Sequence, residues 1–381
     1  MKKFQFKCIL CMVGVLLLTC FSPVFLLAQD AAREPQVVAS VTDQAVAEAV
    51  KRGADYLRVR QAEDGSFSSM MGSGITSITL IGLLQNGYTV EDPMVSKALK
   101  FLETKVHADG AIFDEKLGVG NYETSVAVVA FKYANKDGRY DKILKNAEKY
   151  LRKYQWDESE ALDSSDIKYG GAGYGGGMSR PDLSNTGFLL DALVELGAGP
   201  DDEAVKKALV FVSRCQNLES QHNTFPWAAE NPDGGFIYNP LDTEKVDREG
   251  RKIPLKSYGS MTYTGFKSLV YAGIKEDDIR FKSALAWLTK NYSVKENPGQ
   301  DQAGLYYYYI VMAKTLKLLG KDTFKDDHGA EHNWRNEILA EILGAQQQDG
   351  SWVNTKSGRW MESNADLVTA YALMIIGNCK K

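Results

Sequence analysis

The feature that most constrains this chain is a short motif that recurs six times. A small residue is followed three positions later by an aromatic residue and then by an aliphatic one, as in Ala98, Phe101 and Leu102. Five copies end at Leu57, Leu102, Leu151, Val212 and Leu288, and a sixth, partial copy ends at Ile342-Leu343. A repeated unit of this size can bury its apolar face only against neighbouring units, so the recurrence predicts an architecture of similar units packed side by side.

Each copy of the motif lies on an amphipathic helix. In the third copy, Tyr140, Leu144, Ala147 and Leu151 follow the spacing of one helical face. Asp-Gly pairs at 64–65, 109–110, 233–234 and 349–350 are typical of turns. A second, more apolar helix is expected after each motif, with Ser or Thr as the N-cap of most of them. The expected ranges are 76–84, 124–133, 184–196, 260–272, 305–319 and 367–376.

Six amphipathic helices that alternate with six apolar ones predict two concentric rings. We therefore expect an all-α fold, an (α/α)6 toroid over residues 43–378, with the apolar helices inside. An open superhelix is the competing arrangement. Alternating β-branched runs are few, which argues against a large sheet.

One copy of the motif is nearly complete as a known repeat. Arg52, Gly53, Tyr56, Leu57 and Gln61 precede Gly65-Ser66-Phe67. This order resembles the QW repeat of squalene–hopene cyclases and of the related prenyltransferases, and weaker copies cover most of the chain. The resemblance implies the toroid fold. It also implies that a set of polar and aromatic residues ties the outer helices together: Gln61, Gln155, Gln216, Gln347 and Trp352.

The N-terminal segment predicts export. Lys2, Lys3 and Lys7 precede an apolar run that ends at Ala28, which is typical of a cleaved signal peptide over 1–28. Residues 29–42 are then a linker, and the protein is periplasmic or extracellular. Retention of the segment as an anchor is the alternative, and membrane association is expected only through it. Without these three lysines, 42 basic residues stand against 49 acidic ones, which does not favour nucleic acid as a partner.

The resemblance does not extend to the cyclase reaction. Squalene–hopene cyclases carry Pro-Asp-x-Asp-Asp-Thr, in which the central aspartate protonates the substrate. Here Pro181, Asp182 and Thr186 match, but Ser184 replaces the proton donor and Asn185 replaces the last aspartate. A serine hydroxyl is too weak an acid to protonate an alkene. We therefore expect no ordinary proton-initiated cyclisation, and Asp182 and Ser184 as helix caps are an equal alternative.

No metal and no cofactor are expected. Prenyltransferases hold zinc with Asp, Cys and His, but the only cysteines after the N-terminal segment are Cys215 and Cys379, and neither has a histidine at ligand spacing. These two cysteines allow at most one disulfide bond within the chain.

A candidate pocket is predicted where the inner helices begin, because helices of one ring start at the same end. The glycine stretch 170–177 is expected to cover it. Core packing is the alternative for most of its tyrosines. The candidate residues are Glu123, Tyr174, Arg180, Asp182, Ser184, Asn185, Met261, Tyr263, Tyr306, Tyr307, Tyr308, Tyr309, Arg359, Trp360 and Glu362.

Three functions remain open. The first is an exported protein that binds an apolar or polyprenyl-like ligand in a central cavity, which a lumen lined by Tyr and Met would favour. The second is a polysaccharide-active lyase or hydrolase acting on a glycan, which paired acids in a groove would favour. The third is a noncatalytic interaction protein, which a sealed lumen would favour.

Overall fold

The computed structural model describes residues 40–175, 180–242, 249–250 and 255–380. The predicted signal peptide and most of the predicted linker lie outside these residues. Within the described part of the chain, no helix combines the length and the apolar character needed to cross a bilayer.

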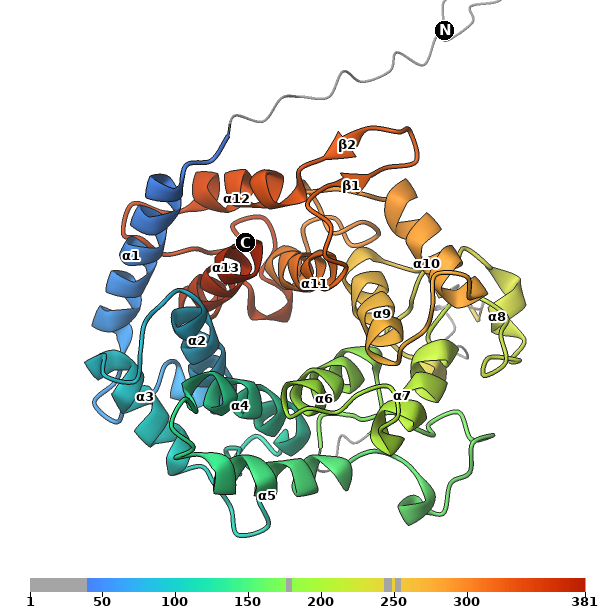
Figure 1. Ribbon diagram of the computed structural model, residues 1–381, viewed down its shortest axis with the longest axis horizontal. Helices are drawn as coiled ribbons and strands as arrows, with labels where there is room; N and C mark the ends of the chain where they lie inside the picture. Colours follow the sequence, from blue (N-terminus) through green and yellow to red (C-terminus); the bar gives the residue numbers. More distant parts are fainter. Residues whose placement is uncertain (1–39, 176–179, 243–248, 251–254, 381) are drawn as a thin grey trace, which may run out of the picture. The chain divides into compact units, whose positions relative to one another are not determined.

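Twelve helices form two concentric rings (Figure 1). The inner helices are α2 (Gly74–Gln85), α4 (Gly120–Ala134), α6 (Leu183–Glu195), α9 (Gly259–Tyr271), α11 (Leu305–Leu318) and α13 (Ala365–Cys379). The outer helices are α1 (Asp43–Arg60), α3 (Pro93–Glu103), α5 (Asp141–Arg152), α7 (Glu203–Arg214), α10 (Ile279–Lys290) and α12 (Trp334–Ala345). Each inner helix packs against two inner neighbours, and α13 packs against α2, so the ring closes. The (α/α)6 prediction is confirmed, and the open superhelix is excluded.

Where the structure describes them, the connections contain short elements. Strands β1 (Phe324–Lys325) and β2 (Glu331–His332) pair antiparallel between α11 and α12. A four-residue helix, α8 (Trp227–Glu230), follows α7. Single helical turns are η1 (Ser69–Met71), η2 (Glu158–Glu160), η4 (Pro240–Asp242) and η5 (Arg359–Met361).

The two rings differ in burial as the sequence patterns predict. On outer helix α5, Leu144, Ala147, Tyr150 and Leu151 are buried and the lysines face solvent. On inner helix α2, ten of the twelve residues are buried. Apolar burial on both sides of the inner ring therefore holds the fold together.

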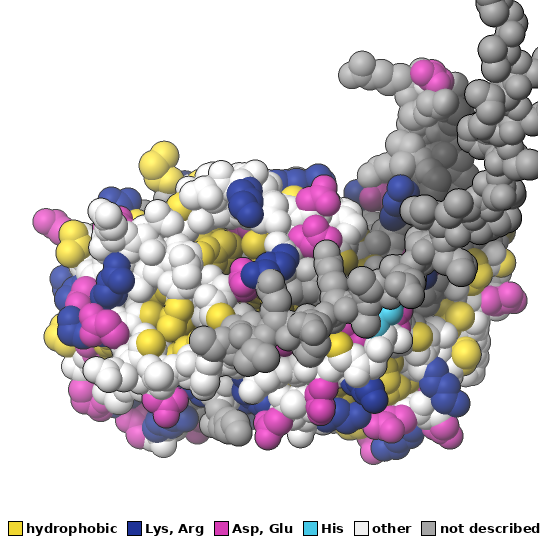
Figure 2. Space-filling model, turned by 90° about the horizontal axis from the view of Figure 1, so that it is seen from above, with side chains coloured by type: hydrophobic (Ala, Val, Ile, Leu, Met, Phe, Trp, Pro, Cys, Tyr) yellow, Lys and Arg dark blue, Asp and Glu magenta, His cyan; other side chains and the backbone are white. Residues whose placement is uncertain are grey.

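Figure 2 shows acidic and basic side chains interspersed on the uncovered part of one face, so no patch of one sign dominates there.

The expected Ser and Thr N-caps of the inner helices are mostly wrong. The inner helices begin up to four residues earlier than expected, and among them only α6 and α13 have a side-chain cap, from Asp182 and Asn364. The threonines lie inside the first turns and bind the connecting loops instead. In five repeats a threonine hydroxyl accepts a hydrogen bond of 2.9–3.1 Å from the loop backbone. These threonines are Thr76, Thr124, Thr186, Thr262 and Thr369.

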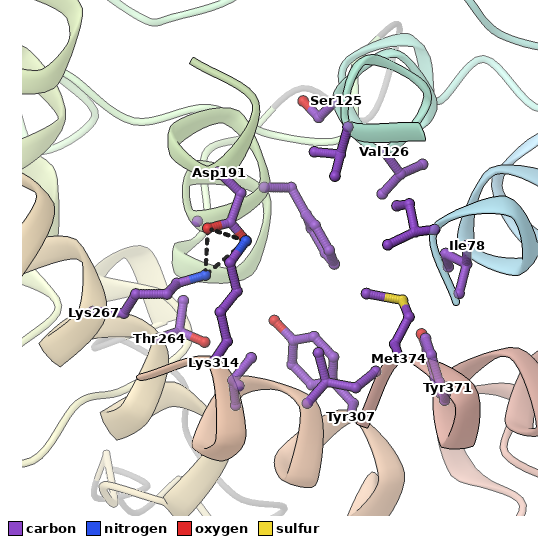
Figure 3. A pocket seen from close by; sticks show the side chains of 16 residues that line it. Ile78, Ser125, Val126, Asp191, Thr264, Lys267, Tyr307, Lys314, Tyr371 and Met374 are labelled. Atoms are coloured by element: carbon purple, nitrogen blue, oxygen red, sulfur yellow. Dashed lines mark hydrogen bonds and ion pairs between the residues drawn. The ribbon is translucent and has the colours of Figure 1, made fainter. Parts of the chain in front are cut away.

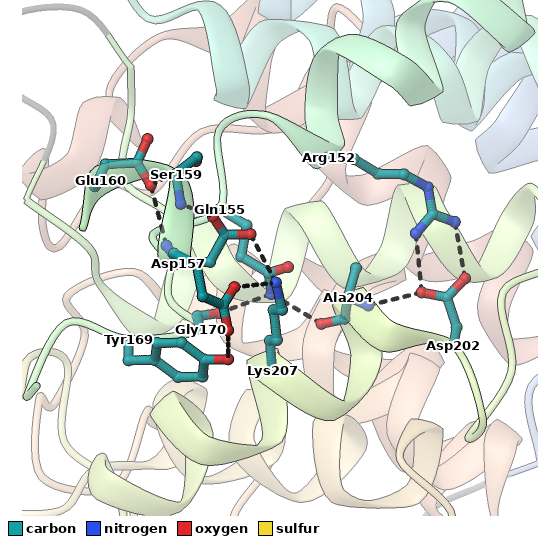
Figure 4. A network of polar contacts seen from close by, with 11 residues as sticks. Arg152, Gln155, Asp157, Ser159, Glu160, Tyr169, Gly170, Asp202, Ala204 and Lys207 are labelled. Carbon is teal, nitrogen blue, oxygen red and sulfur yellow. Dashed lines mark hydrogen bonds and ion pairs between the residues drawn. The ribbon is translucent and has the colours of Figure 1, made fainter. Parts of the chain in front are cut away.

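Four glutamines tie the outer helices to one another. Each glutamine Nε2 donates to the glycine carbonyl of its own turn and to a carbonyl in the first two turns of the next outer helix, at 2.8–3.0 Å. Figure 4 shows this tie at Gln155, between Gly170 and Ala204, beside the ion pair of Arg152 with Asp202. The other glutamines are Gln61, Gln216 and Gln346.

The tie in the sixth repeat corrects the prediction by one residue. Gln346, not Gln347, binds Gly350 and reaches Ala49 of α1, whereas the Gln347 amide donates to Ala345. The reason is that Ile342, not Leu343, is the fully buried aliphatic residue of this copy. Trp352 is also fully buried, and its indole donates to the Ile342 carbonyl at 2.7 Å.

Gly350 shows why a glycine is needed where the last turn meets helix α1. Its φ is +90°, and a Cβ there would lie 2.4 Å from the Arg52 carbonyl oxygen. Only glycine accepts both the backbone conformation and the close approach. Cys215 and Cys379 are both free and buried, so the disulfide that the sequence allowed does not form.

Candidate functional site

A cavity lies inside the inner ring, and all six inner helices line it (Figure 3). The space between the lining side chains is ≈ 620 Å³ when the part open to solvent is included. The volume that can be compared with known cavities is about 50 Å³, so the cavity is narrow. Most of the lining is apolar: Ile78, Ile81, Val126, Val129, Phe188, Ile310, Val311 and Met374.

One cluster of charges interrupts this apolar lining. Asp191 of α6 lies between Lys267 of α9 and Lys314 of α11. The Lys267 Nζ is 2.6 and 2.7 Å from the two carboxylate oxygens, and the Lys314 Nζ is 3.0 Å from one of them. The Tyr271 hydroxyl donates to the same carboxylate at 3.0 Å. The cavity lining therefore carries two cations and one anion.

The cluster is ionised near neutral pH. Burial opposes ionisation of Asp191, but the two lysines beside it keep its pKa below the usual value. Burial lowers the pKa of Lys267 to about 8, although Asp191 opposes the shift. Burial also disfavours the charge of Lys314, but the negative charge of Asp191 outweighs it and raises the pKa. Asp191 is therefore a counter-ion and is unsuited to donate a proton.

Aromatic rings form the wall of the cavity near the start of α11. Tyr307 lines the cavity, and its ring is 6.0 Å from that of Phe188, which stands edge-on to Tyr122 at 5.1 Å. The Tyr307 hydroxyl is 3.1 Å from the Ser184 Oγ. Burial raises the pKa of Tyr307 to about 12, so this phenol stays neutral.

The four consecutive tyrosines have different positions. Tyr307 alone among them lines the cavity. The hydroxyls of Tyr308 and Tyr309 donate to the carbonyls of Ser293 and Val294, at 2.7 and 2.6 Å. These bonds hold the loop of the fifth repeat, which has no Asp-Gly turn. Tyr306 is buried, with its ring 6.3 Å from that of Tyr309.

Two predicted site residues, Glu123 and Glu362, hold helix starts. Glu123 accepts hydrogen bonds from the backbone of Ser73 and Gly74 at the start of α2. Glu362 accepts from the backbone of Tyr306 and Tyr307 at the start of α11, each at 3.0 Å. Both side chains are about 1% exposed, and burial raises the pKa of each. A buried carboxyl group that receives backbone N–H groups is well suited to cap a helix.

Asp182 plays the same part within its own helix. It is buried and caps α6 through the backbone N–H of Asn185, whose side-chain amide also donates to it at 2.8 Å. Burial raises the pKa of Asp182 to about 6. Tyr174 is 38% exposed, and Arg180 forms an ion pair with Asp242 at 2.8 Å. Of the glycine stretch, residues 176–177 lie outside the described residues.

The remaining predicted residues are divided between core and surface. Met261 and Tyr263 are buried on α9. Arg359 stacks over the ring of Trp360 at 4.5 Å, and Trp360 is 47% exposed. The cavity lining thus includes Tyr307 and no other predicted pocket residue. Ligand binding by the other residues stays a prediction.

Sequence reasoning did not single out Asp191, Lys267 or Lys314. A signal for them exists, because each is a charged residue within a range expected to be an apolar inner helix: 184–196, 260–272 and 305–319. A charge within a buried helix is rarely unpaired. A search for opposite charges in the middle of these helices would have found the cluster.

Comparison with known proteins shows the fold alone. No family model and no curated protein matches the chain. A type II terpene cyclase, MstE from Scytonema, is similar in its apo structure at 13% identity, covering 88% of this chain and 97% of that one, with a TM-score of 0.51. A variant of that cyclase in complex with merosterolic acid A, its product, has a TM-score of 0.52 at 12% identity, with the same coverage.

An α-amylase from Clostridium perfringens is as similar as the cyclase. It is 11% identical over 87% of this chain and 98% of that one, with a TM-score of 0.52. The chain therefore shares an α/α toroid fold with terpene cyclases and with a glycan-active enzyme, and this likeness does not choose between their activities.

Proposed function

We propose that this protein binds an apolar, polyprenyl-like small molecule in its central cavity and does not cyclise it. The observation that carries the proposal is the cavity itself, whose lining is mostly apolar and contains one ionised cluster. Apolar cavities with a few placed polar groups are typical of small-molecule sites.

The cavity has no group suited to start a cyclisation. Protonation of an alkene needs a strong, protonated acid. Asp191 is the acid of the lining, and Lys267 and Lys314 hold it as a carboxylate. Ser184, at the position of the cyclase proton donor, is bonded to the Tyr307 hydroxyl and is a very weak acid. One similar cyclase is in complex with merosterolic acid A, which illustrates a ligand that this type of fold can hold.

The glycan-active alternative has less support. Glycoside hydrolysis generally uses two carboxyl groups, one on each side of the bond. The cavity lining has one, Asp191, and both of its oxygens are engaged by Lys267. Among the residues that the structure describes, none supplies a second acid to this lining to complete the pair.

We also propose that the protein acts outside the cytoplasm, on the strength of the N-terminal basic and apolar pattern. Mass spectrometry of the protein from its own host is expected to show a mature N-terminus near Gln29. An intact Met1 in the membrane fraction would instead indicate an anchor.

Native mass spectrometry tests the binding proposal. We expect an apolar molecule to copurify with the wild-type protein from its own host. The variant Val129→Trp fills the cavity and should lose that molecule, whereas Val59→Trp should keep it, because Val59 is 86% exposed on α1. Thermal unfolding of both variants checks that they are folded. Retention of the molecule by Val129→Trp, or conversion of squalene to hopene by the wild type, would contradict the proposal.

A further inference from the structure

We propose that the ligand of the cavity is an acid, an apolar chain that ends in one carboxylate group bound by Lys314. The inference rests on the proposed function, since it specifies the charge of the molecule that the cavity holds. It follows from the way in which the charged cluster is paired, from the count of its charges and from its place in the cavity.

The two lysines are not equally engaged. Lys267 is 2% exposed, and it bonds to both oxygens of Asp191 at 2.6 and 2.7 Å. Lys314 makes one contact with the same carboxylate at 3.0 Å and is 23% exposed. Among the residues that the structure describes, no other acceptor is recorded for the Lys314 ammonium group. A lysine has three N–H donors. Lys314 therefore has donors left for a ligand, whereas Lys267 is committed to Asp191.

The charges of the lining do not balance. Two lysines face one aspartate, and the other groups that contact this aspartate or line the cavity near it, Tyr271 and Tyr307, are neutral phenols. Glu195 lies one turn beyond Asp191 on α6 and does not line the cavity, and its Oε1 is 3.5 Å from the Tyr133 hydroxyl. Its negative charge acts on Lys314 from outside the lining and helps to raise the pKa of that lysine. The lining residues alone therefore carry one excess positive charge, and an excess charge at an apolar surface is unfavourable. One negative charge on a ligand would balance the lining.

The excess positive charge of the lining also favours one type of ligand head group over others. A neutral alcohol would leave the excess positive charge of the lining in place. A diphosphate would bring two or more negative charges to a site with one excess cation, and the surplus would be buried without a partner. A monocarboxylate matches the excess, and its oxygens can accept short, charge-assisted hydrogen bonds from an ammonium group.

The position of the cluster orients such a ligand. Figure 3 shows Asp191, Lys267 and Lys314 on one side of the cavity, and Ile78, Met374 and Tyr371 on the opposite side. The carboxylate end would therefore lie against α6, α9 and α11. The apolar chain would extend toward α2, α4 and α13, where its burial supplies most of the binding free energy.

Isothermal titration calorimetry with matched probes tests the inference. Farnesoic acid, farnesol and farnesyl diphosphate share one isoprenoid chain and differ in the charge of the head group. With the full chain at pH 7, we expect farnesoic acid to bind about 10-fold to 100-fold more tightly than farnesol, the range typical of a hydrogen bond to a charged group. Farnesyl diphosphate should bind more weakly than the acid.

Two lysines of α11 provide a variant and its control. Lys314→Met removes the cation of the cavity and leaves Asp191 and Lys267 as a neutral pair, so the fold should persist. Lys317→Met removes the same charge from an exposed position three residues further along the helix. We expect Lys314→Met to reduce the affinity for farnesoic acid to that for farnesol and to leave farnesol binding within about threefold, a change of about 0.6 kcal/mol. Lys317→Met should change neither. Lys314→Gln serves as a second variant, with thermal unfolding as the check on folding.

The outcomes separate the two proposals. Equal affinities of the wild type for farnesoic acid and farnesol, or an equal loss of both in Lys314→Met, would overturn the acid inference and leave the apolar cavity standing. Tighter binding of the diphosphate than of the acid would overturn it too. Failure of all three probes to bind the wild type would overturn the proposed function, and with it the inference.

Discussion

Buried carboxyl groups serve two different ends in this molecule. Glu123, Glu362 and Asp182 lie at the starts of inner helices and accept hydrogen bonds from backbone N–H groups. Asp191 lies two turns into α6 and faces two ammonium groups. Burial raises the pKa of the first three groups, whereas the two cationic neighbours of Asp191 lower its pKa. Surroundings, and not residue type, therefore decide which acids are capping groups and which is a counter-ion.

The pKa of Asp182 predicts a measurable pH dependence of stability. Its value is about 6 in the folded protein against 3.8 for an unperturbed group, so the folded state binds the proton more tightly. This contribution to the free energy of unfolding is fully present below about pH 4 and is lost as the pH rises through 6, by roughly 3 kcal/mol. Tyr174, Tyr238 and Cys215, which act on Asp182 electrostatically, all have raised pKa values and do not titrate in this window.

Denaturant unfolding of the wild type and of Asp182→Asn between pH 4 and 7 measures the contribution of Asp182 to the free energy of unfolding. Other acids titrate in both proteins, so the difference between the two isolates Asp182. We expect the wild type to lose stability relative to the variant as the pH rises. Parallel curves for the two proteins would show that Asp182 is not perturbed as described.

At the scale of elements, the ring closes through the same ties that join its other repeats. Gln346 connects the end of α12 to Ala49 of α1 as Gln155 connects α5 to α7. Gly350 lets the last turn approach α1, as Gly110 lets an earlier turn approach α5. The first and last helices of the outer ring are therefore held together by contacts of one repeated kind.

The neighbouring glutamines of the last repeat test this tie. Gln346→Ala removes two hydrogen bonds and leaves the carbonyls of Ala49 and Gly350 without this donor, so we expect a loss of about 1–3 kcal/mol in the free energy of unfolding. Gln347→Ala is the control, because its side chain bonds only to Ala345 at the surface, and it should change stability by less than about 0.5 kcal/mol. Equal effects in chemical denaturation would argue against the tie.

Two glycines allow the cost of a left-handed backbone conformation to be measured separately from the cost of a steric clash. Gly110 has a φ of +97°, and a Cβ there would lie 2.4 Å from the Asn146 carbonyl oxygen, whereas Gly87 has a φ of +91° and open space around it. Gly87→Ala should cost about 1–2 kcal/mol, the cost of the left-handed conformation. Gly110→Ala should cost at least about 1 kcal/mol more, because the turn must also move away from α5. Similar unfolding midpoints for the two variants would contradict this account of the turn.

The sequence was informative about elements and much less so about the site. The inner helices were predicted within a few residues, because long apolar runs between turns leave little choice. The ties at Gln61, Gln155 and Gln216 followed from the repeat, and the error at Gln347 arose because Ile342 and Leu343 are equally apolar and only packing distinguishes them. The charged cluster is formed by residues of three different repeats: Asp191, Lys267 and Lys314. Whether they meet depends on how the inner helices are shifted along their axes relative to one another, and the spacing of residues along the chain does not reveal this shift.

At the scale of the whole molecule, the double ring explains why a cavity exists at all. Six inner helices that pack side by side in a closed circle leave a centre that only their side chains can fill. Here valines, isoleucines and a methionine line much of that centre, and a narrow cavity remains between them. We therefore expect a ligand to bind at the centre of the ring and not at its rim.

Photoaffinity labelling tests that claim most directly. Diazirine analogues of farnesol and farnesoic acid, activated on the full-length protein and followed by peptide mass mapping, should label cavity residues such as Val129, Phe188 and Ile310. An excess of the unmodified compound should abolish the labelling. Labels confined to the exposed side chains of Met70 and Trp360, or labels that competitor does not reduce, would contradict a central binding site.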